Sequence, residues 1–94
     1  MKKEAEIYRR IERVCKGVAN HRRVQILVQL NKTPEMSVSE LTEILRVDFR
    51  TASEHIRKLA HAGLVMKRSD GVSVRHKVTD LGARFLKYID IITG

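Results

Sequence analysis

The sequence contains one cysteine, Cys15, among its 94 residues. A single thiol cannot form a disulfide within the chain, and it cannot build a metal site from several thiolates. We interpret Cys15 as a small buried apolar residue, because it falls near the apolar stripe of the first predicted helix. A redox role for this thiol is the alternative interpretation.

Long apolar runs are missing as well. No stretch approaches the roughly 18 apolar residues that a membrane-spanning helix needs. The charged N-terminus "MKKEAEIYRR" has no apolar signal-peptide run after it. Repeats, low-complexity tracts and Gly/Ser linkers are also absent. We therefore expect a cytoplasmic protein, with no membrane partner, that forms one domain over residues 1–94.

Acidic residues are outnumbered by basic ones. The chain has 19 Lys and Arg against 11 Asp and Glu, which gives a net charge of +8 at pH 7. A basic domain attracts polyanions, of which nucleic acid is the usual one. The sequence offers no phosphate-cradling glycine loop, no nucleophile motif and no paired acid and base. These features indicate a binding protein and not an enzyme.

Apolar residues recur at helical spacing through most of the chain. Helices are predicted over residues 4–17, 20–32, 37–46 and 48–63, and from residue 79 towards the C-terminus. Residues suited to cap a helix N-terminus stand at the start of four of them, namely Asn20, Ser37, Asp48 and Thr79. Only Val47 and Asp48 separate the third helix from the fourth, and so short a joint is typical of a helix-turn-helix.

The apolar period changes after Gly63, which predicts a β-hairpin over "LVMKRSDGVSVRHKVT". Asp70-Gly71 at its middle is a preferred pair for a two-residue turn. That turn pairs residue 69 with 72, 67 with 74 and 65 with 76. One face of the hairpin then carries Val65, Val74, His76 and Val78, and the other face carries Arg68, Arg75 and Lys77. The order of elements predicts an α+β fold that is mainly α.

The fourth predicted helix has an apolar face of Ala52, Ile56 and Leu59 and a second face rich in charge. The second helix of a helix-turn-helix enters the major groove of DNA with its N-terminal residues against base edges. Arg, Ser, Thr and Glu side chains can bond bases there, and basic residues of a hairpin can bind flanking phosphates. The candidate DNA contacts are Phe49, Arg50, Thr51, Ser53, Glu54, Arg57, Lys58, Lys67, Arg68, Arg75 and Lys77.

The run "VDFRTASEHIRKLAHAGLVMKR" resembles the recognition helix and first wing strand of ArsR-type winged-helix transcriptional repressors. The matching or conservatively substituted positions are Ser53, His55, Ile56, Leu59, Ala62, Gly63, Leu64 and Val65. "ANHRRVQILVQL" and "HKVTDLG" resemble two further segments of that family, although MarR-type and other winged helices share parts of these motifs. The resemblance implies a winged helix-turn-helix with four helices, a β-hairpin wing and a C-terminal helix. It also implies a dimer that binds operator DNA.

The chain departs from this family pattern at its metal sites. Metal-sensing members carry Cys-Val-Cys where "EMSVSEL" has Ser37 and Ser39, and a hydroxyl is a poor ligand for soft metals. The last helix has Asp80 and Asp90 but lacks the His that zinc-sensing members use. We therefore expect no metal and no other cofactor.

A second departure lies in the recognition helix. Members of the family often have a polar Gln at the position of Phe49, and a neutral or basic residue at the position of Glu54. A carboxylate near phosphates weakens binding unless a cation neutralises it. Arg50 and Arg57 lie one turn from Glu54 on either side, so we expect an ion pair within the helix.

The first and last helices carry more apolar surface than a monomer of this size easily hides. The alternative is that they only close the monomer's own core. The candidate dimer contacts are Ile7, Ile11, Val14, Phe85, Leu86, Ile89 and Ile92. The leading hypothesis is a homodimeric repressor that binds a palindromic operator in double-stranded DNA and does not respond to metal. The alternatives are a winged helix that docks another protein, and a regulator that responds to oxidation of Cys15.

Overall fold

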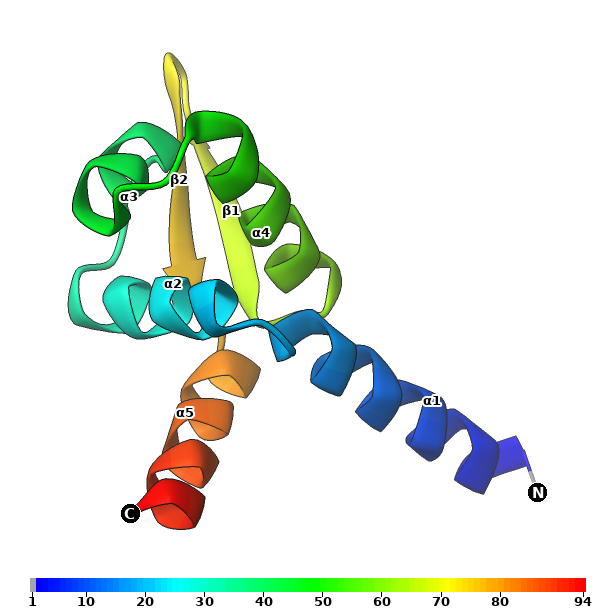
Figure 1. Cartoon of the computed structure of the whole chain (residues 1–94). Helices are drawn as coiled ribbons and strands as arrows, with labels where there is room; N and C mark the ends of the chain where they lie inside the picture. Colours follow the sequence, from blue (N-terminus) through cyan, green and yellow to red (C-terminus); the bar gives the residue numbers. More distant parts are fainter. Residues whose placement is uncertain (1) are drawn as a thin grey trace.

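A computed structural model describes residues 2–94 of the chain, and its elements follow the predicted order (Figure 1). The α+β, mainly α prediction and the winged helix-turn-helix architecture are therefore confirmed. The elements are α1 (Lys2–Val18), α2 (His21–Lys32), α3 (Val38–Leu45), α4 (Phe49–His61), β1 (Val65–Asp70), β2 (Ser73–Val78) and α5 (Asp80–Thr93).

Four helices begin at the residues predicted to cap them. The side chains of Asn20, Asp48 and Thr79 each accept a hydrogen bond from a backbone N–H in the first turn of the following helix. Ser37 and Glu40 form a reciprocal capping box at the start of α3. Each helix start is therefore fixed by a local hydrogen bond between groups within three residues of one another.

The turn between α3 and α4 is as short as the sequence predicted. α3 ends at Arg46, which adopts the left-handed conformation (φ 55°, ψ 47°) and donates its N–H to the carbonyl of Thr42 at 2.8 Å. Val47 and Asp48 then lead directly into α4. This turn fixes the direction in which α4 leaves α3, and so it fixes which face of α4 meets solvent.

The core lies between α2, α3, α4 and the base of the hairpin. The predicted apolar face of α4 is fully covered there, since Ala52, Ile56 and Leu59 are all buried. The side chains from other elements that are completely buried are Ile26, Leu27, Leu30, Leu41 and Leu64. Each apolar side chain of Leu or Ile size that is buried in this way contributes about 1.5–3 kcal/mol. The core therefore holds α4 firmly by one side and leaves its other side free.

The hairpin forms with a register that differs from the predicted one. Val65 pairs with Val78, Lys67 with His76 and Asp70 with Ser73, so the predicted pairing of residue 65 with 76 is wrong by two positions. The turn is Gly71-Val72, and Gly71 has φ 72° at its first position. Glycine at the first central position is typical of a type II′ hairpin turn. A shift of two residues leaves every side chain on its predicted face.

Helices α1 and α5 project from the rest of the structure in different directions (Figure 1). The side chains of residues 3–13 of α1 are all exposed, and only its C-terminal part reaches the core through Val14 and Val18. In α5 the first half packs against the core, whereas Ile91 and Ile92 are about three-quarters exposed, at 77% and 75%. No helix in the described part of the chain is both long and apolar enough to cross a membrane.

Candidate nucleic-acid interface

The free face of α4 gathers most of the predicted contacts on this helix. Phe49, Arg50 and Thr51 are exposed in its first turn, where a helix-turn-helix reads base edges. Ser53 is half-buried and faces the wing. The backbone N–H of Thr51 donates to the cap Asp48 at 2.6 Å, and hydrogen bonds from the side chain and the backbone of Thr51 lower the pKa of Asp48. The first turn therefore presents one cation, one hydroxyl and one aromatic ring to solvent.

The predicted ion pair of Glu54 forms with Arg57. The guanidinium donates from Nε to Oε2 at 3.4 Å and from Nη2 to Oε1 of the carboxylate. This hydrogen bonding holds the pKa of Glu54 below its usual value, and the positive charges of Lys58 and Arg50 lower it further. Arg50 itself has no ion-pair partner among residues 3–94. Of the two arginines that flank Glu54, Arg50 is therefore the one whose cation is free.

Two arginines on the outer face of the wing are held by carboxylates. The guanidinium of Arg68 donates to both carboxylate oxygens of Glu35, at 2.8–3.3 Å. Arg75 donates from Nη1 to Glu40 at 3.0 Å and to the backbone carbonyl of Glu35 at 3.2 Å. The outer face is therefore less positive than its sequence suggests. Lys77 on the same face has no ion pair within the described part of the chain.

Lys67 lies on the opposite face of the wing from these arginines. A groove of about 420 Å³ separates this face from the first turns of α3 and α4, and Lys67, Phe49, Ser53 and Val74 are among the residues that line it. The structure thus brings a wing lysine close to the start of the recognition helix. Val72 at the tip of the wing is fully exposed. It was absent from the predicted set, because its place in the turn depends on the register.

Two histidines, His76 on β2 and His55 on α4, lie partly or fully buried in the elements that carry the candidate interface. His76 is buried, and its Nδ1 lies 2.9 Å from the carbonyl oxygen of Met36. The backbone groups of His76 also pair with Glu35 and Met36 at 2.9 Å, which ties the segment before α3 to the edge of β2. Burial lowers the pKa of His76. Burial, followed by the positive charge of Arg23, lowers the pKa of His55, whose Nδ1 is buried without a hydrogen-bond partner.

The predicted dimer contacts divide into two groups. Ile7, Ile11 and Ile92 are more than half exposed. Val14, Phe85 and Leu86 instead pack partly against the chain's own core, and Ile89 is half-buried. Two exposed aromatic residues on the same two helices were not in the predicted set, namely Tyr8 and Tyr88. Their helical spacing from Ile11 and Ile92 is the signal that could have identified them.

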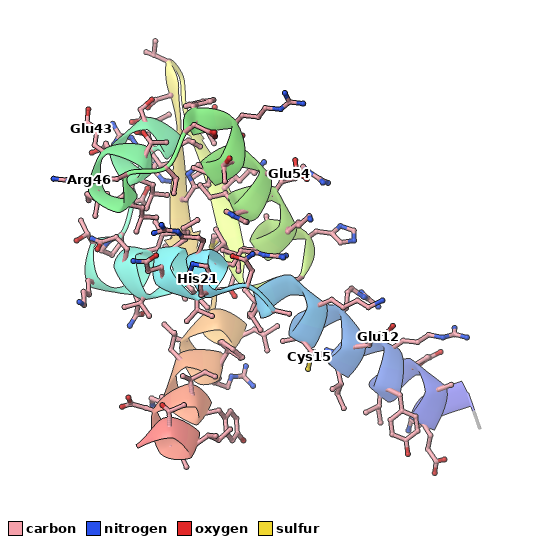
Figure 2. All side chains as sticks on the ribbon, in the orientation of Figure 1. Glu12, Cys15, His21, Glu43, Arg46 and Glu54 are labelled. Carbon is pink, nitrogen blue, oxygen red and sulfur yellow. The ribbon has the colours of Figure 1, made fainter. Side chains whose placement is uncertain are left out.

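Cys15 is exposed in the single chain. The interpretation of Cys15 as a buried residue is therefore wrong for the monomer. It lies on α1 beside Ile11 and Val14, in an apolar groove of about 320 Å³ that Leu81 of α5 also lines. Figure 2 shows its sulfur at the surface of α1. The apolar stripe of α1 exists as predicted, but the chain itself does not cover it.

The two serines at the start of α3 have different structural environments. Ser37 caps the helix, and Ser39 is exposed and accepts at its backbone carbonyl from Thr42. Within the described chain, no three His, Cys, Asp or Glu residues lie close enough together to hold a metal ion.

Comparisons with known proteins agree with this architecture. Residues 20–67 match the sequence pattern of the arsR family of bacterial regulatory proteins. The arsenical resistance operon repressor of Bacillus subtilis (strain 168) is 29% identical over 77 residues, which cover 82% of this chain and 73% of that protein.

Solved structures give the same result. The homodimeric winged helix-turn-helix DNA-binding domain of a possible ArsR-family transcriptional regulator from Mycobacterium bovis superposes with a TM-score of 0.90 at 26% identity. That match covers 99% of this chain and 86% of the other. The transcriptional regulator HlyU from Vibrio vulnificus CMCP6 gives a TM-score of 0.74 at 27% identity, with 97% and 95% covered.

The elements and their order define a winged helix-turn-helix protein. The matched segment spans α2, α3, α4 and the start of β1, which together form the helix-turn-helix and its support. The chain belongs to the ArsR family of bacterial regulatory proteins. It is accordingly a regulator and not an enzyme.

Proposed function

We propose that this protein binds a specific sequence of double-stranded DNA and regulates transcription from it as a repressor. The observation that carries the proposal is α4, whose apolar face is buried while Arg50, Thr51, Arg57 and Lys58 point to solvent. A helix held in this way can place its first turn against base edges in the major groove. The net charge of +8 supplies the general attraction to phosphates.

The predicted contacts then fall into two roles. Arg50 and Thr51 in the first turn are the proposed base contacts, since Arg can bond guanine with two hydrogen bonds and Thr can bond several bases. Lys58 and the wing lysines, Lys67 and Lys77, are the proposed phosphate contacts. Phe49, Ser53, Glu54, Arg57, Arg68 and Arg75 complete the proposed interface.

We infer that the protein acts as a homodimer through α1 and α5. Ile7 and Ile11 on α1 and Ile92 on α5 are exposed apolar side chains that a second copy would cover. The Mycobacterium bovis relative is itself described as homodimeric. A symmetric dimer places two recognition helices about 34–36 Å apart, so the operator is expected to be palindromic.

The proposed regulator has no metal effector. Hydroxyl groups at Ser37 and Ser39 bind soft metals poorly, and Ser37 is already used as a helix cap. Residues 1–94 act as one domain in this proposal, and its place of action is the cytoplasm, where a bacterial regulator meets DNA.

Selection of bound sequences from random duplex DNA, at two salt concentrations, tests the function. We expect enrichment of an inverted repeat and an affinity that falls steeply with salt. A selection that enriches no sequence would reject the proposal and favour a winged helix that docks proteins.

The dimer has a separate test with a matched control. Ile11→Glu places a charge in the proposed interface, so light scattering should give the mass of a monomer. Ile44→Glu on α3 makes the same change at a residue of similar exposure, 51% against 54%, and should leave the mass unchanged. A dimeric Ile11→Glu variant would contradict the proposed interface.

A further inference from the structure

A basic pocket of about 430 Å³ lies between the C-terminal part of α1, the first turn of α2 and the second half of α4. We call it the α1/α2/α4 pocket. No Asp or Glu is among its lining residues in the described chain. Its charged and titratable lining residues are Arg13, Lys16, Arg23, Arg57, Lys58 and His61.

Close packing of α1 against α4 forms this pocket. A Cβ placed on Gly17 would lie only 2.4 Å from the Cβ of Ala62, so glycine is needed for the observed approach. The same approach brings the end of α1 to the first turn of α2, where Arg23 Nη1 donates to the carbonyl of Lys16 at 3.3 Å. Cations from three helices therefore converge around a small apolar contact.

Helix dipoles explain only some of these cations. Lys16 and Lys58 stand in the last turns of their helices, where positive charge is favourable. Arg23 stands in the first turn of α2, where positive charge is unfavourable and no acidic residue is present. Its Nε is also buried without a hydrogen-bond partner. The bond of Arg23 to the carbonyl of Lys16, at the end of α1, offsets part of the first cost, and an anion in the pocket would offset it further.

Carboxylates engage only part of the positive charge. Lys16 pairs with Glu12 at 3.0 Å, and Arg57 pairs with Glu54. Arg13 and the other Lys and Arg side chains of the pocket have no ion-pair partner in the part of the chain that the structure describes. The pocket therefore keeps a net positive charge of the kind that binds phosphate groups.

The length of α4 indicates which phosphate could reach the pocket. Arg50 and Lys58 are eight residues apart, which is about 12 Å along a helix. The major groove of B-DNA is also about 12 Å wide. If the first turn of α4 contacts base edges, the second half of the helix reaches the backbone that borders the groove.

We propose that the α1/α2/α4 pocket is a phosphate-binding site for the DNA backbone that flanks each half-site. This assignment rests on the proposed function, in which α4 lies in the major groove. It adds α1 and α2 to the DNA-binding surface, and neither helix was among the predicted contacts. Because backbone phosphates are the same in every sequence, the site contributes affinity and positioning without sequence preference.

Arg13→Gln tests this assignment, because Arg13 is exposed and lies outside the interface already proposed. Binding to the selected operator is measured between about 50 and 200 mM salt. We expect the slope of log affinity against log salt to become shallower by about 0.9 for each half-site, with sequence preference unchanged. Lys32→Gln removes one charge at the far end of α2 and should leave the slope unchanged.

Ethylation of DNA phosphates locates the contact independently. For the native protein, ethylation of one phosphate beside each half-site should block binding, and Arg13→Gln should remove that block. An unchanged slope in both Arg13→Gln and Arg13→Glu, with normal folding and mass, would overturn the assignment while DNA binding itself stands. Failure of the native protein to bind any duplex would instead reject the proposed function.

Inorganic phosphate distinguishes a backbone phosphate from a free one. At constant ionic strength, phosphate and chloride should displace operator DNA equally well from the native protein. Stronger displacement by phosphate that Arg13→Gln abolishes would assign the pocket to a free phosphate compound, and would overturn its assignment to the DNA backbone.

Discussion

Glu54 and Arg57 form an ion pair on the exposed face of α4, one turn apart and within the surface proposed to enter DNA. The pair removes a positive charge from that surface and leaves a carboxylate where phosphates would approach. Exposed ion pairs contribute little to folding stability, so this pair is not needed to hold α4 in place. Its effect is therefore expected in DNA affinity and in the choice of sequence.

Glu54→Gln should strengthen binding to DNA of arbitrary sequence. The change removes one negative charge and frees the Arg57 guanidinium for a phosphate, so the salt dependence should become steeper by up to about 0.9 for each half-site. Fluorescence anisotropy with operator and random duplexes measures both quantities. Glu43→Gln on α3, whose side chain points away from α4 in Figure 2, makes the same charge change and should have a smaller effect. Equal effects of the two variants would mean that only net charge matters.

Arg50 and Arg68 should differ in what they contribute to DNA binding. Arg50 has no ion pair in the described chain and stands in the first turn of α4, so Arg50→Ala should cost about 1–3 kcal/mol at its preferred base pair and relax specificity there. Arg68 is held by Glu35, so Arg68→Ala should change affinity much less. Competition assays with single-base operator variants measure the difference. A larger loss from Arg68→Ala would show that Arg68 leaves Glu35 when DNA binds.

The start of each helix after α1 was predictable because its causes are local. The caps Asn20, Ser37, Asp48 and Thr79 bond backbone groups only two or three positions away. The buried face of α4 was predictable for a similar reason, since helical spacing alone places its apolar residues on one side. The surface opposite to that face could then be named as the candidate site.

Contacts between distant parts of the chain were not predictable in this way. Glu35 and Arg68 are 33 positions apart, so nothing in either segment indicates that the wing arginine is paired. The wing register depended on whether Asp70 or Gly71 opens the turn, and both choices put the same residues on each face. The α1/α2/α4 pocket combines cations from three helices, and each of them resembles an ordinary solvated charge in its own segment.

Gly17→Ala should destabilise the protein although alanine favours helices. The new methyl group would meet the Cβ of Ala62 at 2.4 Å, and such overpacking costs about 1–3 kcal/mol. Part of that cost is offset by about 1 kcal/mol of helix propensity. Urea denaturation gives the net change, and adding Ala62→Gly should recover stability lost to the clash. Additive effects of the two substitutions would show that α1 and α4 do not meet at this point.

Acidification should destabilise the fold through His76, which is buried, and His55, which is half-buried. Burial lowers the pKa of His76, and burial followed by the charge of Arg23 lowers the pKa of His55. Below about pH 6.5 the unfolded chain therefore binds protons that the folded chain does not, so the free energy of unfolding falls as pH decreases. The slope should reach at most about 1.4 kcal/mol per pH unit for each histidine. Denaturation between about pH 7.5 and 5.5 avoids the titration range of most carboxylates.

His76→Leu should remove one of these two contributions. Leucine is similar in size to histidine and is apolar, so it can occupy the same buried space. The Met36 carbonyl keeps its hydrogen bond from the backbone N–H of residue 76 at 2.9 Å. The variant should therefore fold, lose modest stability at high pH and show a shallower decline on acidification. His55→Gln supplies the matching test on α4, since glutamine keeps a polar side chain but does not titrate. If the native slope persists in both single variants and in the double variant, groups other than these histidines control the response to acid.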